Sequence, residues 1–116
     1  MKFTNDSKVL RNLLIQNVPV EVDDVNQNKV VLYIQDVTTY IDYYIISWSP
    51  ELNDFLALVD PLHTDNVLDL EHVPLSFLKD SRLFYKVYPK SKQYNWKKKY
   101  EELLPVKYGI PSKYNR

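Results

Sequence analysis

The densest run of hydrophobic and aromatic residues spans positions 29–61, KVVLYIQDVTTYIDYYIISWSPELNDFLALVDP. This run predicts three successive β-strands separated by two turns, because β-branched and aromatic segments are interrupted by turn-forming residues. Residues 40–48 form the central strand of the three. Successive side chains of a strand point to opposite faces, and both faces of this strand carry large side chains. We therefore expect one face to meet the core and the other to meet helices or a partner.

Further strand patterns flank the central strand. Residues 18–22 alternate in part between apolar and polar side chains, and Pro19 places this strand at an edge or at a strand start. Together with strands over 29–35, 40–48 and 54–59, it predicts a four-stranded antiparallel meander.

Three other segments complete the expected sheet region. Residues 83–88 have a strand composition and would add a fifth strand to the meander. Residues 36–39 fit either a turn or a bulged continuation into the central strand. Residues 67–72 fit either a short strand or a helical turn. The pattern alone does not choose between these alternatives.

Helical periodicity appears near both ends of the chain. Residues 6–16 place their leucines on one arc, which predicts an amphipathic helix. Residues 91–104 predict a second helix, capped by Ser91 and ended by Pro105. A short helix over 74–80 would begin with its proline. The cap of the first helix is expected from one of three residues: Thr4, Asn5 or Asp6.

These elements predict an α+β fold: an antiparallel four- to five-stranded sheet (meander) flanked by an N-terminal and a C-terminal helix, with a basic C-terminal arm. A length of 116 residues fits one domain. We assign this domain to residues 1–104 and an extended arm to residues 105–116, which lack periodicity. With 45% hydrophobic residues, the chain can bury enough apolar surface to fold unaided.

Residue types that are scarce exclude several classes of protein. The sequence has no cysteine, which rules out disulfides, thiolate nucleophiles and cysteine-bound zinc. Its one glycine, Gly109, cannot build a phosphate-binding loop, a dinucleotide fingerprint or a nucleophile elbow. No segment has the pattern of a signal peptide or a membrane span. We therefore expect a cytoplasmic protein (in the host cytoplasm if a phage encodes it) that is not an enzyme and takes no cofactor.

Charge is distributed unevenly although the formal net charge is zero. Positions 30–78 contain eight acidic residues and no lysine or arginine, whereas positions 81–116 contain ten basic residues against two acidic ones. One interpretation is that the basic end folds back and neutralises the acidic body. The other is that the two regions form faces that contact different partners.

The acidic body predicts a docking surface for a larger intracellular protein with a basic groove. Tyrosine favours such interfaces because it gives a large contact area with little entropy to lose, although the ten tyrosines also fit a general compositional bias. The expected contact residues are Asp36, Asp42, Tyr43, Tyr44, Glu51, Asp54 and Asp60.

The basic end supports an alternative function in which the chain binds nucleic acid, since lysines are interleaved with aromatic residues there. Three observations oppose it: Trp96 and Tyr100 fit the buried stripe of a helix, the pI is about 6.7, and the acidic body would repel phosphate. The residues that would contact nucleic acid are Lys90, Lys92, Lys97, Lys98, Lys99, Lys107, Lys113 and Arg116.

A third function is a metal-dependent hydrolase at the loop that holds His63 and His72. Imidazole and carboxylate groups can bind zinc or manganese, and Asp60, Asp65 and Asp69 lie nearby in the sequence. The spacing matches no metal motif, and solvated histidines beside surface carboxylates explain these residues better. We therefore assign no metal site.

The favoured hypothesis is a non-catalytic protein–protein binding module. Its size, residue bias and lack of chemical motifs suggest a small phage or mobile-element protein that inhibits or adapts a larger host protein, such as one that processes nucleic acid. A homo-oligomer is compatible with the sequence, and a membrane partner is not expected.

Overall fold

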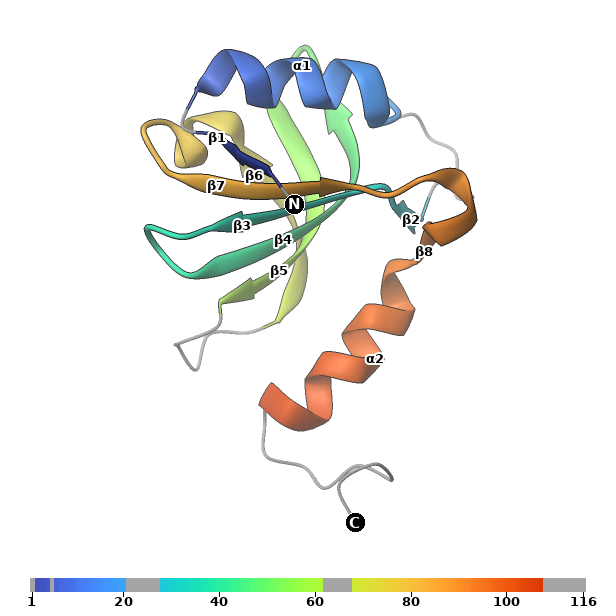
Figure 1. Ribbon diagram of the computed structural model, residues 1–116. Helices are drawn as coiled ribbons and strands as arrows, with labels where there is room; N and C mark the ends of the chain where they lie inside the picture. Colours follow the sequence, from blue (N-terminus) through green and yellow to red (C-terminus); the bar gives the residue numbers. More distant parts are fainter. Residues whose placement is uncertain (1, 5, 21–27, 62–67, 108–116) are drawn as a thin grey trace.

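The computed structural model describes residues 2–4, 6–20, 28–61 and 68–107 (Figure 1). It confirms the predicted α+β class, with a sheet of six strands instead of four or five and with helices near both ends. The strand order is β1-β7-β3-β4-β5-β6, and each neighbouring pair is antiparallel. The strands are β1 (Lys2–Thr4), β3 (Leu32–Asp36), β4 (Ile41–Ser49), β5 (Asp54–Pro61), β6 (Asp69–Pro74) and β7 (Leu83–Val87).

The strand predicted to be central is β4, which pairs with β3 on one side and β5 on the other. Residues 42–48 are all buried, as expected for a strand covered on both faces. The register with β5 shifts between Ile45 and Ser47, and such a bulge changes the alternation of side chains along the strand. Trp48 consequently joins the same hydrophobic cluster as Ile45.

Several strand predictions need correction. The strand predicted over 29–35 is interrupted at Val31. Its first part, β2 (Lys29–Val30), pairs with β8 (Tyr94–Asn95) in a separate small sheet. Of the edge strand predicted over 18–22, Val20 forms one isolated parallel bridge with Trp48, and 21–22 lie outside the described residues.

The order of the strands also differs from a simple meander. β7 joins the sheet, as expected of a fifth strand, but it pairs with β3 and not with the strand that precedes it in the sequence. β1 then pairs with the outer side of β7. A strand as short as β1 cannot show an alternating pattern, so no sequence pattern predicts it.

The N-terminal helix is confirmed as α1 (Ser7–Asn17). Asp6 is its cap, because its carboxylate accepts a hydrogen bond from the Lys8 backbone N–H at 2.8 Å. Leu10 and Leu14, one turn apart, are buried against the sheet residues of the larger hydrophobic cluster. Figure 1 shows α1 lying across this face of the sheet.

The C-terminal helix, α2 (Trp96–Lys107), differs from its prediction at both ends. Ser91 lies in a short 3₁₀ helix, η2 (Lys90–Lys92), and the Asn95 side chain accepts from the Lys97 N–H at 2.9 Å in the first turn of α2. Pro105 does not end α2, which continues to Lys107. The first three residues predicted as arm thus belong to α2, and 108–116 lie outside the described residues.

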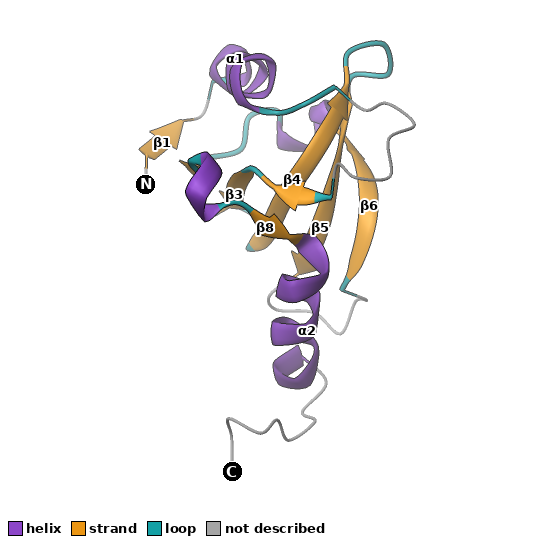
Figure 2. Cartoon of the chain, turned by 90° about the vertical axis from the view of Figure 1, so that its right-hand side faces the viewer, coloured by secondary structure: helices purple, strands orange, loops and turns teal. Residues whose placement is uncertain are grey.

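Two hydrophobic clusters occupy the two faces of the sheet. The first joins α1 to β3, β4 and β5, and the second is built around Val30, Tyr44, Leu58 and Leu68. Aromatic residues of α2 and of the segment before it pack against this second cluster. Figure 2 shows α2 leading away from β8, at the opposite end of the molecule from α1. Within the described ranges, no helix is long and apolar enough to cross a membrane.

The connection between β3 and β4 is a turn, which settles one alternative left open by the sequence. The Tyr40 N–H donates to the Asp36 carbonyl at 2.8 Å, and the Asp36 carboxylate accepts from the N–H groups of Thr38 at 2.9 Å and Thr39 at 3.3 Å. Tyr40 has a φ of 59°, a left-handed conformation that is uncommon for a residue other than glycine. The sequence also left open whether residues 67–72 form a short strand or a helical turn. The structure has a strand here, β6, which begins at Asp69.

Candidate binding site

The acidic docking surface expected from the sequence is not an exposed face of the protein. Five of its seven residues are buried, whereas Glu51 is exposed and Asp54 is partly buried. The reason is that β3, β4 and β5 are covered on both faces, so alternation along these strands brings none of the five to the surface. The buried residues are Asp36, Asp42, Tyr43, Tyr44 and Asp60.

Two of these carboxylates face each other inside the sheet. Asp42 on β4 is opposite Asp60 on β5, and the Tyr33 hydroxyl donates to Asp42 at 2.7 Å. Burial is the main cause that raises the pKa of Asp42, and the charge of Asp60 adds to it. The bond from Tyr33 and the charge of Lys99 act in the opposite direction. Because both carboxylates are buried, they are not available to a partner in this conformation.

The basic residues of the alternative function divide into two groups. Lys90, Lys92, Lys97 and Lys98 are exposed. The ammonium group of Lys99 instead lies 5.5 Å from the ring centroid of Tyr44 and 5.7 Å from that of Tyr94, and it pairs with Glu102 at 3.1 Å. It therefore helps to hold α2 against the sheet. The side chain of Lys107, together with Lys113 and Arg116, is outside the described part of the chain.

The aromatic residues near these lysines are occupied by packing. Tyr88, Tyr94, Trp96 and Tyr100 all contact the cluster around Tyr44. Stacking with bases requires exposed ring faces, so this arrangement does not provide the aromatic platform that the alternative function needs. Nucleic-acid binding at the exposed lysines stays a prediction.

The histidine loop of the metal hypothesis is described in part. His72 lies on β6, but His63 and Asp65 are outside the described residues. Among the residues that the structure does describe, no group of three or more histidine and carboxylate side chains is placed to hold a metal ion.

A cavity of about 440 Å³ opens on the face of the sheet that also carries α1. Three strands form it: Ile41 and Tyr43 come from β4, Val59 and Pro61 from β5, and Glu71, His72 and Val73 from β6. Its remaining wall is Phe77 of η1 (Leu75–Leu78), the 3₁₀ helix that follows β6. A cavity of this size with mostly apolar walls is typical of a ligand or side-chain binding site.

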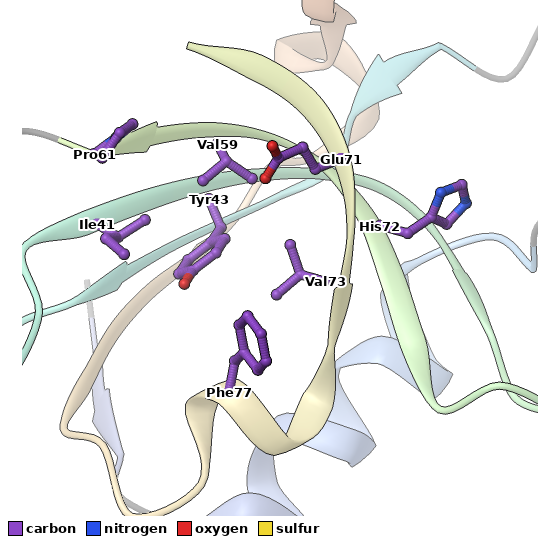
Figure 3. A pocket seen from close by; sticks show the side chains of 8 residues that line it. All are labelled: Ile41, Tyr43, Val59, Pro61, Glu71, His72, Val73 and Phe77. Carbon is purple, nitrogen blue, oxygen red and sulfur yellow. The ribbon is translucent and has the colours of Figure 1, made fainter. Parts of the chain in front are cut away.

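Figure 3 shows how the side chains of β6 are divided around this cavity. Glu71 and Val73 point toward Tyr43 and Val59, whereas the imidazole of His72 points to the other side of the strand. This is the alternation expected along a strand. Among the described lining residues, Glu71 is the only carboxylate, and none is a lysine or arginine.

Phe77 is the most exposed aromatic side chain of the cavity, with 67% of its surface accessible. The turn that carries it is held firmly: Leu78 is buried, and the Leu75 N–H donates to the Asn53 carbonyl at 2.9 Å. The Lys79 N–H closes the turn on the Ser76 carbonyl at 3.2 Å. An apolar side chain is thus displayed on a fixed backbone, which lowers the entropy cost of binding.

A second hollow, a groove of about 300 Å³, lies on the other side of η1. Lys8, Leu10 and Arg11 of α1 form one wall, and Leu75, Ser76 and Lys79 form the other, with Asn53 between them. Arg11 is fixed by a hydrogen bond to the Asn53 side chain, and its guanidinium lies 5.7 Å from the ring centroid of Trp48. We call the residues that line the cavity and the groove the η1 surface.

No sequence pattern predicts a functional role for Phe77, Glu71 or Ile41. A phenylalanine in a short apolar helix normally packs inward, so its exposure has no sequence signal. The cavity itself depends on the antiparallel register that places Ile41 opposite Pro61 and brings β6 beside β5. Tyr43 is the one residue that the predicted docking surface and the cavity share.

The edge of the sheet beside the cavity is poorly suited to adding another strand. β6 is the terminal strand, yet the Leu70 N–H already donates to the Asp69 carboxylate at 2.8 Å. Pro74, at the end of β6, has no N–H to offer. Charged side chains and prolines are common means of protecting a sheet edge, so binding is better sought on the face of the sheet than along its edge.

Comparisons of this chain with protein-family models, with curated proteins and with solved structures found no match. The fold and the site together define a small α+β domain with a concave apolar surface around η1.

Proposed function

We propose that this chain is a non-catalytic protein-binding module and that it docks onto a larger protein through the η1 surface. The observation that carries the proposal is the exposure of Phe77 on a fixed turn at the mouth of an apolar cavity. Binding energy in protein interfaces is concentrated in a few aromatic or apolar anchors next to such hollows. The docking site proposed from the structure therefore replaces the buried acidic residues proposed from the sequence.

The flanking charges support a protein partner over a small apolar molecule. The cavity has a carboxylate at its wall, whereas Lys8 and Lys79 border the groove on the other side of η1. A surface with an apolar centre and charges of both signs around it has the anatomy of a protein interface. An inhibitory or adaptor role and a cytoplasmic setting, the latter in keeping with a chain that lacks cysteine, are part of the proposal.

The test is affinity capture from lysate of the source cells, using the wild-type protein, Phe77→Ala and Phe3→Ala. Phe3 is the matched control, since it is an exposed phenylalanine on β1, at the other edge of the sheet. We expect nuclease-treated lysate to yield a protein that Phe77→Ala binds roughly tenfold or more weakly, because loss of an anchor costs about 2 kcal/mol. Phe3→Ala should bind the same protein as tightly as the wild type does. Urea unfolding confirms that both variants fold.

Two results would contradict the proposal. One is a partner that both variants bind as tightly as the wild type, which would remove the η1 surface from the interface. The other is recovery of nucleic acid alone, lost at high salt, which would favour the exposed lysines of η2 and α2 as the functional residues.

A further inference from the structure

The cavity beside η1 combines apolar walls with a negative charge, and this combination specifies what can occupy it. Ile41, Val59 and Val73 offer only carbon atoms to an occupant. Glu71 directs its carboxylate toward the same space (Figure 3). No lysine or arginine among the described lining residues neutralises that charge.

The potential inside the cavity is also set by a second carboxylate. Tyr43, at the centre of the cavity, is only 3% exposed. Burial is the main cause that raises the pKa of Tyr43 to about 12, and the charges of Asp36 and Glu71 add to it. Both carboxylates are thus close enough to affect a group at this position, so the cavity favours a cation over an anion.

We infer that the cavity receives a basic side chain of the partner protein, with its aliphatic stem against Ile41, Val59 and Val73 and its cationic head beside Glu71. This inference rests on the proposed function and adds the chemistry of the partner. Lysine and arginine side chains have an apolar stem and a charged end, which matches the two parts of the cavity. Arginine fits better than lysine, because the exposed ring of Phe77 offers a face on which a guanidinium can stack.

Other occupants fit less well. A neutral apolar side chain would withdraw water from the Glu71 carboxylate without providing a counter-charge, which is unfavourable. An acidic side chain would be repelled by Glu71 and Asp36. The groove on the other side of η1, with Lys8 and Lys79, has the opposite preference, so the two hollows together would orient the partner.

The test uses three small probes of similar size on the isotope-labelled protein: n-butylguanidinium, 1-pentanol and pentanoate. Their binding is followed by the backbone amide NMR signals of Val59, Val73 and Phe77. We expect n-butylguanidinium to shift these signals at the lowest concentration, pentanol to bind more weakly and pentanoate to bind least. Because Glu71 is exposed, its contribution is modest, and Glu71→Gln should weaken n-butylguanidinium binding by about two- to fivefold.

Glu51→Gln is the matched control, since it removes an exposed carboxylate in the turn between β4 and β5 that does not line the cavity. It should leave n-butylguanidinium binding unchanged. Equal binding of n-butylguanidinium and pentanol, binding that is insensitive to Glu71→Gln, or no binding of any probe would each overturn the inference.

These outcomes are separable from those of the proposed function. If Phe77→Ala loses the partner while Glu71→Gln has no effect on any probe, the η1 surface is a docking site and its cavity does not select a cation. If n-butylguanidinium binding depends on Glu71 while capture of the partner does not depend on Phe77, the cation preference stands and docking through this surface is wrong.

Discussion

The Tyr33 hydroxyl donates a hydrogen bond to the Asp42 carboxylate at 2.7 Å, linking β3 to β4 on the face that α2 covers. Tyr33 lies opposite Tyr44 and not opposite Asp42, so the bond runs diagonally across the two strands. On its other side, Asp42 is opposite Asp60. The bond therefore provides a donor for a buried carboxylate that faces a second one.

The stability of the protein should depend on the protonation of Asp42. The pKa of Asp42 is raised by burial, so the folded state binds this proton more tightly than the unfolded chain does. The free energy of unfolding should therefore fall as the pH rises from the ordinary value of 3.8 through the raised value, and the penalty is complete above it. Asp42→Asn removes this penalty while keeping an oxygen that accepts from Tyr33.

Urea unfolding at a series of pH values measures this effect. The gain in stability of Asp42→Asn over the wild type should increase with pH across the weakly acidic range and then level off. Glu51→Gln, which changes an exposed carboxylate, is the control and should show little pH-dependent difference. Parallel curves for the wild type and Asp42→Asn would show that Asp42 has no raised pKa.

Tyr33→Phe should destabilise the protein by about 1–3 kcal/mol at neutral pH, because it leaves the buried Asp42 carboxylate without this donor. The cost should be smaller in the Asp42→Asn background, where the acceptor is neutral. A double-mutant cycle of the two substitutions, measured by urea unfolding, gives the coupling directly. Additive effects of the two substitutions would contradict the importance of this bond.

Alkaline pH should also destabilise the fold through its buried tyrosines. Burial raises the pKa of Tyr33, Tyr44 and Tyr94, and it raises the pKa of Tyr43 to about 12. An unfolded tyrosine loses its proton near pH 10, so the free energy of unfolding should fall as the pH rises above about 10. Tyr43→Phe should reduce this loss. Around neutral pH, the difference in free energy of unfolding between Tyr43→Phe and the wild type should not change with pH.

Tyrosinate absorbance provides the measurement for this prediction. Part of the absorbance change should occur near pH 10, and the remainder should coincide with unfolding followed by circular dichroism. Titration of all tyrosines in one step, well before unfolding, would show that the buried phenols are not protected.

Asp36→Ala should destabilise the protein by about 1–3 kcal/mol, because the buried Asp36 carboxylate accepts from two backbone N–H groups in the turn after β3. Asp36→Asn is the matched variant, since it keeps an acceptor oxygen, and it should lose less stability. Chemical unfolding compares the two. Equal losses would mean that the turn does not depend on the acceptor.

Elements with a strong local pattern were predicted well from the sequence. α1 follows from its leucine spacing and an Asp6 cap, and β4 and β5 follow from dense β-branched and aromatic composition. Most of the predicted docking residues were expected at the surface but are buried. Charge counted along a chain does not reveal whether a strand is covered on both faces, and Asp42 shows that a carboxylate can be buried when a neighbouring hydroxyl donates to it.

The amino-acid sequence by itself determined the α+β class, the helix near each end and the absence of thiol and glycine-loop chemistry, because these depend on composition and on residues a few positions apart. Only the tertiary structure decided that β7 pairs with β3, that β1 extends the sheet and that Phe77 and Glu71 line one cavity. These features depend on contacts between segments far apart in the chain. Local propensity carries no information about such partners, since the same strand pattern fits several neighbours equally well.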